Sequence, residues 1–158
     1  MRLQEQMIEV TRAAAAEVFR YAKAVPEDKQ NWKPLDLGRS VLEQCRELAM
    51  CPHWAIQLVS QDQQPEWNEE AMEAVKREQE QWKTVEDCDA ECNKRLEALF
   101  DVFRNMPDER LAEKKWLPYG GGRDFTMPEM MDYPRWNFTY HLGQIAYIQT
   151  LYGDKEMY

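Results

Sequence analysis

The sequence predicts an all-α protein that folds as a bundle of four long helices. Apolar residues recur every three or four positions, the period of one helix face, in four segments: 3–25, 41–59, 85–106 and 127–152. Capping motifs or prolines stand at the ends of these segments. The chain shows no convincing strand pattern. Long helices without a sheet pattern are typical of a helix bundle.

The first helix is predicted from Leu3 to Val25, because Pro26 then removes a backbone donor. Its apolar stripe comprises Leu3, Met7, Val10, Ala14, Val18, Ala22 and Val25. The connector that follows, 26–38, contains Trp32-Lys33-Pro34, which favours an extended backbone. We expect the Trp32 ring to pack against the bundle.

The second helix is predicted to start at a capping box formed by Ser40 and Glu43 and to extend to about Val59. From Leu48 onward it is apolar nearly all round, as expected of a central, buried helix. Pro52 lacks a backbone N–H and is therefore expected to kink this helix.

A short extra helix that faces solvent is predicted in the polar, acidic stretch 62–83. Its apolar residues lie at near-helical spacing and are Trp67, Ala71, Val75 and Trp82. The third long helix follows over 85–106 and ends at Pro107.

The connection to the last helix carries three consecutive glycines, 120–122, which predict a turn between two short extended pieces. A capping box of Thr126 and Glu129 then starts the last helix, which we expect to end at Gly153. Pro134 is expected to kink this helix or to loosen its first turn.

Composition predicts one domain over 1–158, with enough chain for a single core. Twenty basic against 29 acidic residues give 20 − 29 = −9 at pH 7, which excludes nucleic acid and anionic membranes as partners. The first six residues lack an apolar leader, so we expect a cytoplasmic protein. Its four cysteines are then expected to be reduced, buried thiols.

The candidate site lies on the last helix, where Asn137 and His141 fall one turn apart on the bundle-facing stripe. Burying two polar groups costs about 1–3 kcal/mol each unless a metal, a water or another side chain binds them. Glu47 is a candidate partner, because it heads an otherwise apolar row on the second helix. It could equally be a solvated residue near a helix start. His53 and the methionines 127, 130 and 131 are interpreted as structural residues.

Two motifs resemble the DinB-like (YfiT-like) four-helix-bundle metalloenzyme superfamily. Tyr140-His141-Leu142-Gly143-Gln144-Ile145 is similar to the H-x-G-Q-[IL] signature near the C-terminus of that family. Asn31-Trp32-Lys33-Pro34, followed by Gly38-Arg39-Ser40-Val41-Leu42-Glu43, is similar to its segment before the second helix. The resemblance covers most of the chain and implies a DinB-like bundle with long connections.

The resemblance also implies a divalent metal held by three histidines, one on the second helix and an H-x-x-x-H pair on the last. His141 matches the second histidine of the pair, whereas Asn137 and Glu47 stand at the other two positions. The implied metal ligands are therefore Glu47, Asn137 and His141. This set is harder and weaker than three imidazoles, and a possible ion is zinc, nickel or manganese.

The replacement of two of the three expected histidines leaves two possible functions. The chain is either a divergent member with a degenerate metal site, acting as a transferase or hydrolase on a small molecule, or a non-catalytic bundle. In the second case Glu47, Asn137 and His141 form a structural polar network in a binding or interaction protein. Tyr140, Gln144 and Arg123 are expected nearby, and the family implies a homodimer. An open cavity that reaches the three residues would distinguish the first function from the second.

Overall fold

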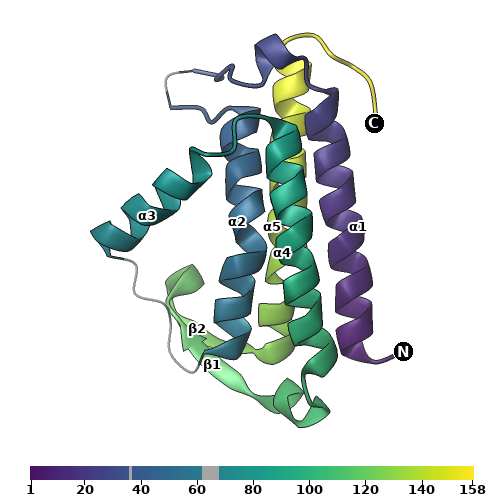
Figure 1. Ribbon diagram of the computed structural model, residues 1–158. Coiled ribbons are helices and arrows are strands. Elements are labelled where there is room, and N and C mark those ends of the chain that lie inside the picture. Colours follow the sequence, from purple (N-terminus) through teal and green to yellow (C-terminus); the bar gives the residue numbers. More distant parts are fainter. Residues whose placement is uncertain (36, 62–67) are drawn as a thin grey trace.

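The four long helices are confirmed in the computed structural model, which describes residues 1–35, 37–61 and 68–158. They are α1 (Leu3–Ala24), α2 (Val41–Ser60), α4 (Val85–Asn105) and α5 (Met127–Leu151). The four helices run side by side, and α3 (Glu69–Gln79) projects from them (Figure 1). Both α1 and α2 pack mainly on α4 and α5, so α1 and α2 are diagonally opposed across the core.

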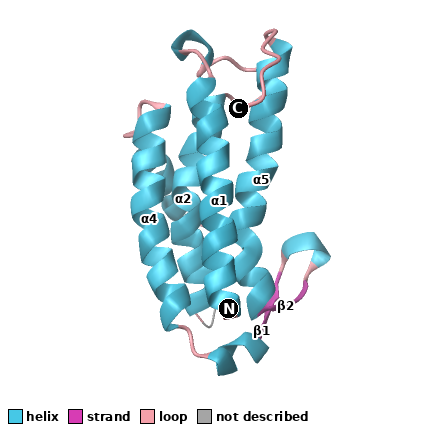
Figure 2. Cartoon of the chain, turned by 90° about the vertical axis from the view of Figure 1, so that its right-hand side faces the viewer, coloured by secondary structure: helices cyan, strands magenta, loops and turns pink. Residues whose placement is uncertain are grey.

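A small hairpin closes one end of the bundle, where α2 ends and α5 begins (Figures 1 and 2). Strands β1 (Lys114–Leu117) and β2 (Arg123–Thr126) pair antiparallel, with Leu117 opposite Arg123. The glycine turn between them confirms the predicted pair of extended pieces. Its three glycines, 120–122, all have positive φ, at 61°, 91° and 84°. Short 3-10 turns occupy Glu27–Lys29, Asp108–Ala112 and Tyr119–Gly121.

The predicted capping boxes are present at the starts of α2 and α5. The backbone N–H of Glu43 donates to the Ser40 hydroxyl at 3.1 Å, and Glu43 accepts from the backbone of Ser40 at 2.8 Å. Thr126 and Glu129 form the same reciprocal pair at α5. Each box satisfies backbone donors that the first helical turn leaves unpaired. None of the described helices is both long and apolar enough to span a bilayer.

The predicted apolar stripe of α1 is wrong over its first half. The positions buried there are Gln4, Ile8, Thr11 and Ala15, one residue later than expected, whereas Leu3, Met7, Val10 and Ala14 are only half-buried. Gln4 is buried with tertiary hydrogen bonds, because its side chain donates to the carbonyl of Met106 at 3.0 Å and to Asp108 at 2.8 Å. From Val18 onward the predicted stripe is confirmed.

Two tryptophans outside the long helices pack on the core. The partly buried Trp32 lies edge-on to Tyr152, with ring centroids 6.4 Å apart, as its prediction requires. Trp82 packs under the guanidinium of Arg95, 5.1 Å from the ring centroid. The short helix α3 has no buried residue, which confirms its exposure, and Trp67 lies outside the described residues.

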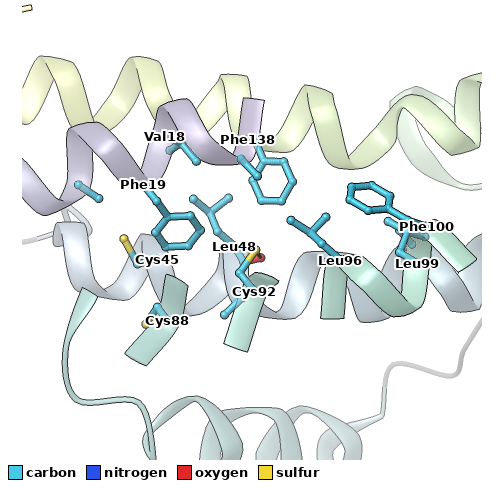
Figure 3. Close-up of a cluster of buried hydrophobic side chains, with 14 of the residues drawn as sticks. Val18, Phe19, Cys45, Leu48, Cys88, Cys92, Leu96, Leu99, Phe100 and Phe138 are labelled. Carbon is cyan, nitrogen blue, oxygen red and sulfur yellow. Dashed lines mark hydrogen bonds between the residues drawn. The ribbon is translucent and has the colours of Figure 1, made fainter. Parts of the chain in front are cut away.

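The core of the bundle is apolar and includes Cys45, Cys88 and Cys92 (Figure 3). Cys51 is also buried, and all four cysteines are free thiols. Phe19, Leu48, Leu96 and Phe138 are each at most 2% exposed. Burial raises the pKa of the Cys51 thiol to about 12, so it is a neutral thiol at pH 7. The interpretation of the cysteines as small buried residues is therefore confirmed.

Helix α2 continues through Pro52, which has no N–H to offer the carbonyl of Leu48. The thiol of Cys92, on the neighbouring helix α4, donates to that carbonyl at 3.5 Å. A tertiary hydrogen bond thus replaces the helical one that the proline removes. Only a donor at position 92 of α4 makes this hydrogen bond. Cys92 therefore has a bonding role in addition to filling space in the core.

We expect Cys92→Ala to lower the free energy of unfolding by about 1–2 kcal/mol, from the lost volume and the unpaired carbonyl. In a Pro52→Ala background the cost should fall by about 0.5–1 kcal/mol, because position 52 then supplies a backbone N–H. Urea denaturation of the four proteins in this double-mutant cycle measures the difference. Cys88→Ala, at another buried position on α4, is the control. Its effect on the free energy of unfolding and that of Pro52→Ala should be additive. Equal coupling for both cysteines would contradict the prediction.

Candidate functional site

His141 lies at the centre of the site, on α5, and is only 1% exposed. Its Nδ1 lies 2.8 Å from Gln44 Oε1, and its Nε2 lies 3.1 Å from Glu47 Oε1. Gln44 and Glu47 are three residues apart on α2, so both side chains reach the same face of that helix. The predicted meeting of Glu47 and His141 therefore occurs in the structure.

Gln44 is a functional residue that the sequence interpretation missed. It is 1% exposed and sits among the buried residues Val41, Cys45 and Leu48. The sequence did contain a sign of this residue, because Gln44 is a polar residue within the apolar, buried face of α2. Its carbonyl accepts a hydrogen bond from Nδ1–H of His141, which fixes the position of the ring.

With Nδ1 donating to Gln44, the other ring nitrogen faces the Glu47 carboxylate. An imidazolium would donate to both oxygens. A neutral ring in this tautomer would instead present a lone pair on Nε2, and a lone pair opposite a carboxylate requires a cation between them. The geometry therefore supports either a closed ion pair or a cation-binding pair of donors.

The Glu47 carboxylate is half-buried and is held from two sides. Its Oε1 faces His141, and its Oε2 accepts a hydrogen bond from Arg39 at 2.5 Å. Burial raises the pKa of Glu47, but the hydrogen bond and charge of His141 and the charge of Arg39 outweigh it and lower the pKa below its ordinary value. Glu47 is thus an ionised carboxylate at neutral pH.

Asn137, one turn before His141 on α5, is 4% exposed. Its Nδ2 is buried and has no hydrogen-bond partner among the described residues. An unpaired buried amide donor costs about 1–3 kcal/mol, and such a group in a native protein commonly has a ligand or water as its partner. Asn137 is therefore close to His141, as predicted, but it takes no part in the hydrogen bonds between His141 and α2.

A pocket of about 760 Å³ opens beside these residues, between α2, the hairpin and the first half of α5. Glu47 and Asn137 lie on its wall, and His141 lies behind Glu47. Trp54 and Tyr140 also line the pocket. The volume lies in the range of small-molecule sites. The open cavity expected for a ligand-binding site therefore reaches Glu47 and Asn137 but not His141.

The remaining candidates have mixed outcomes. Arg123 and Tyr140 line the pocket as expected, whereas Gln144 is half-buried one turn away from it. His53 is exposed and lies 3.1 Å from the Gln57 amide, in agreement with a structural reading. The methionines 127, 130 and 131 are buried in the core.

Glu47 and His141 supply a carboxylate and an imidazole, which are ligand types for Zn²⁺, Ni²⁺ and Mn²⁺, and their facing atoms lie 3.1 Å apart as a hydrogen-bonded pair. Residues 1–35, 37–61 and 68–158 contain no group of three or more His, Cys, Asp or Glu side chains placed to hold a metal. The amide oxygen of Asn137, the third predicted ligand, is a weaker donor than the Glu47 carboxylate or the His141 imidazole.

Three solved structures share this fold. YfiT from Bacillus subtilis, described as a probable metal-dependent hydrolase with an unusual four-helix bundle topology, matches with a TM-score of 0.70 over 95% of this chain and 87% of its own, at 12% identity. A mycothiol-dependent maleylpyruvate isomerase matches with a TM-score of 0.70 over 92% of this chain and 61% of its own, at 11% identity. YjoA, a DinB-like protein from Bacillus subtilis, matches at 0.64 over 97% and 96%, at 12% identity.

These likenesses show that the chain has the DinB-like four-helix-bundle fold. No family model matches the sequence, and no curated protein matches it significantly. At 11–12% identity the fold is shared, while the site must be judged from the residues of this chain.

Proposed function

We propose that this chain is a DinB-like, metal-dependent enzyme of the transferase or hydrolase class that acts on a small molecule. The observation that carries the proposal is the placement of Glu47 and Asn137 on the wall of an open pocket, with His141 bonded to Glu47 from behind. The likeness to a structure described as metal-dependent supports it.

Glu47 and His141 would hold the ion, and the amide oxygen of Asn137 would complete the protein ligands. A divalent ion bound there supplies a Lewis acid that activates water or a thiol. By accepting from Nδ1–H, Gln44 would keep the ring of His141 in the tautomer whose Nε2 lone pair faces Glu47. Arg39 holds the carboxylate of Glu47 in place.

Metal retention tests this proposal. Tag-free protein is incubated separately with Zn²⁺, Ni²⁺ and Mn²⁺, desalted, and assayed by inductively coupled plasma mass spectrometry. We expect about one equivalent of at least one metal in the wild type and a loss of most of it in Glu47→Ala, which removes one of two strong ligands. Glu97→Ala is the control, because that carboxylate is exposed on α4 and pairs with Arg12. Retention of none of the three metals by the wild type overturns the proposal.

A second function is favoured by the hydrogen bonds themselves. Arg39, Glu47, His141 and Gln44 form a continuous chain that is complete without a metal if the ring is an imidazolium. In that case the cluster is a structural polar network that joins α2 to α5, and the protein is a non-catalytic binding or interaction protein. The absence of metal retention would select this alternative.

A further inference from the structure

The pocket wall is rich in aromatic rings. Trp136 and Tyr140 stack on each other at its rim, with centroids 5.3 Å apart and planes inclined by 19°. Each ring is about half exposed, at 54% and 51%. The aromatic residues of the wall are Trp54, Tyr119, Phe125, Tyr133, Trp136 and Tyr140. Exposed aromatic faces gathered around a concavity mark a ligand site and attract cations through their π-electrons.

The charged residues of the pocket wall are mostly carboxylates. Three carboxylates and one arginine line the pocket, namely Glu47, Glu129, Asp132 and Arg123, for a sum of +1 − 3 = −2. Arg123 is already neutralised by Glu129 at 2.8 Å, and its guanidinium lies 3.7 Å from the centroid of the Phe125 ring. The net charge of −9 on the whole chain attracts cations toward the surface.

Arginines outside the wall pair with two of the carboxylates, Arg39 with Glu47 and Arg135 with Asp132. Each carboxylate of the wall is therefore paired with one arginine, and these charges balance among the described residues. The aromatic faces of the wall then decide the preference, and they attract a cation and repel an anion.

Asn137 is an independent sign of a ligand. This residue lines the pocket and is 96% buried, and its Nδ2 makes no hydrogen bond of normal geometry among the described residues, although its amide lies beside the Cys51 thiol. A bound molecule that places an acceptor near Nδ2 would remove the cost of that unpaired donor.

We infer that the pocket binds an organic cation, a quaternary ammonium or a protonated amine attached to an apolar or aromatic group. The cationic head is recognised by the aromatic rings of the wall. The inference names the ligand class of the proposed function and rests on this pocket being the substrate site. It does not require a bound metal.

Isothermal titration calorimetry with three probes of similar size tests the inference. The probes are benzyltrimethylammonium, benzyl alcohol and phenylacetate, which share a benzyl group and carry charges of about +1, 0 and −1 at pH 7. The cation is expected to bind at least about 10-fold more tightly than either of the other two. Equal affinities, a preference for phenylacetate, or no binding of the cation would overturn the inference.

Two tyrosines on α5 locate the binding. Tyr140→Leu removes a ring from the pocket rim and is expected to weaken cation binding by about 5-fold or more. Tyr147→Leu is the matched control, because Tyr147 is 65% exposed on the same helix and is not part of the wall. Similar affinities in the two variants would mean that the cation binds elsewhere.

Titrations with EDTA and with the best-retained metal separate this inference from the proposed function. If no metal is retained but the cation still binds with the expected selectivity, the inference stands and the metal-dependent enzyme does not. If metal is retained and the three probes bind equally, the enzyme proposal stands and the ligand class is wrong.

Discussion

Replacing Glu47 and Asn137 together by histidine is expected to raise the affinity for Zn²⁺ by about 100-fold or more, which corresponds to about 2.7 kcal/mol. The reason is the donor chemistry. Three neutral imidazoles suit Zn²⁺, whereas an amide oxygen is a weak ligand for it. Positions 47 and 137 both lie on the pocket wall, and position 137 is one turn before His141 on α5. The side chains at the three positions can therefore converge on one ion.

Competition with a chromophoric zinc chelator measures this gain. The control is Glu47→His combined with Asn137→Leu, which has the same change on α2 but no donor on α5 at position 137. We expect most of the gain to be absent in that control. Equal affinities in the two double variants would show that position 137 does not point to the same ion as His141.

Replacing His141 by alanine is expected to lower the free energy of unfolding by about 3 kcal/mol. The change leaves a cavity at a site that is 1% exposed and removes the hydrogen-bond partner of both Gln44 and Glu47. For a chain of this length the loss corresponds to a fall in Tm of about 6–12 °C. Thermal denaturation followed by circular dichroism measures it. His53→Ala is the control, because His53 is exposed and a change in Tm of less than about 2 °C is expected.

The same melting curves with and without added metal distinguish the two functions. If the cluster binds a metal, addition of the ion raises the Tm of the wild type but leaves that of His141→Ala unchanged. If the cluster is only a polar network, the difference in Tm between the two proteins is the same with metal and with chelator. The second result would exclude the metal site and leave the structural network.

Much of the fold could be predicted from the sequence, because its determinants are local. The capping boxes at Ser40 and Thr126 and the breaks at Pro26 and Pro107 act within a few residues of themselves. The long helices consequently begin and end within one or two residues of their predicted bounds. The stripe on α5 placed Asn137 and His141 correctly, since helical periodicity determines which positions share a face.

Predictions that depended on contacts between distant segments were incomplete. Gln4 is buried because the carbonyl of Met106 accepts its hydrogen bond, and the sequence of the first helix contains no sign of that carbonyl. The interpretation of Cys92 as a small buried residue was correct, but its hydrogen bond to the carbonyl of Leu48 arises only when α2 and α4 pack together.

In the candidate site, too, some features follow from the local sequence and others from contacts between distant segments. By itself the sequence determined the helices, the buried polar pair on the last of them, and the candidate carboxylate Glu47 on the second. The tertiary structure alone decided that Gln44 and Arg39 hold the two ends of the His141–Glu47 pair, and that the hairpin leaves an open pocket beside it. Periodicity determines which side of a helix a residue occupies. The partner that it meets there depends on the packing of other helices, which a local pattern does not contain.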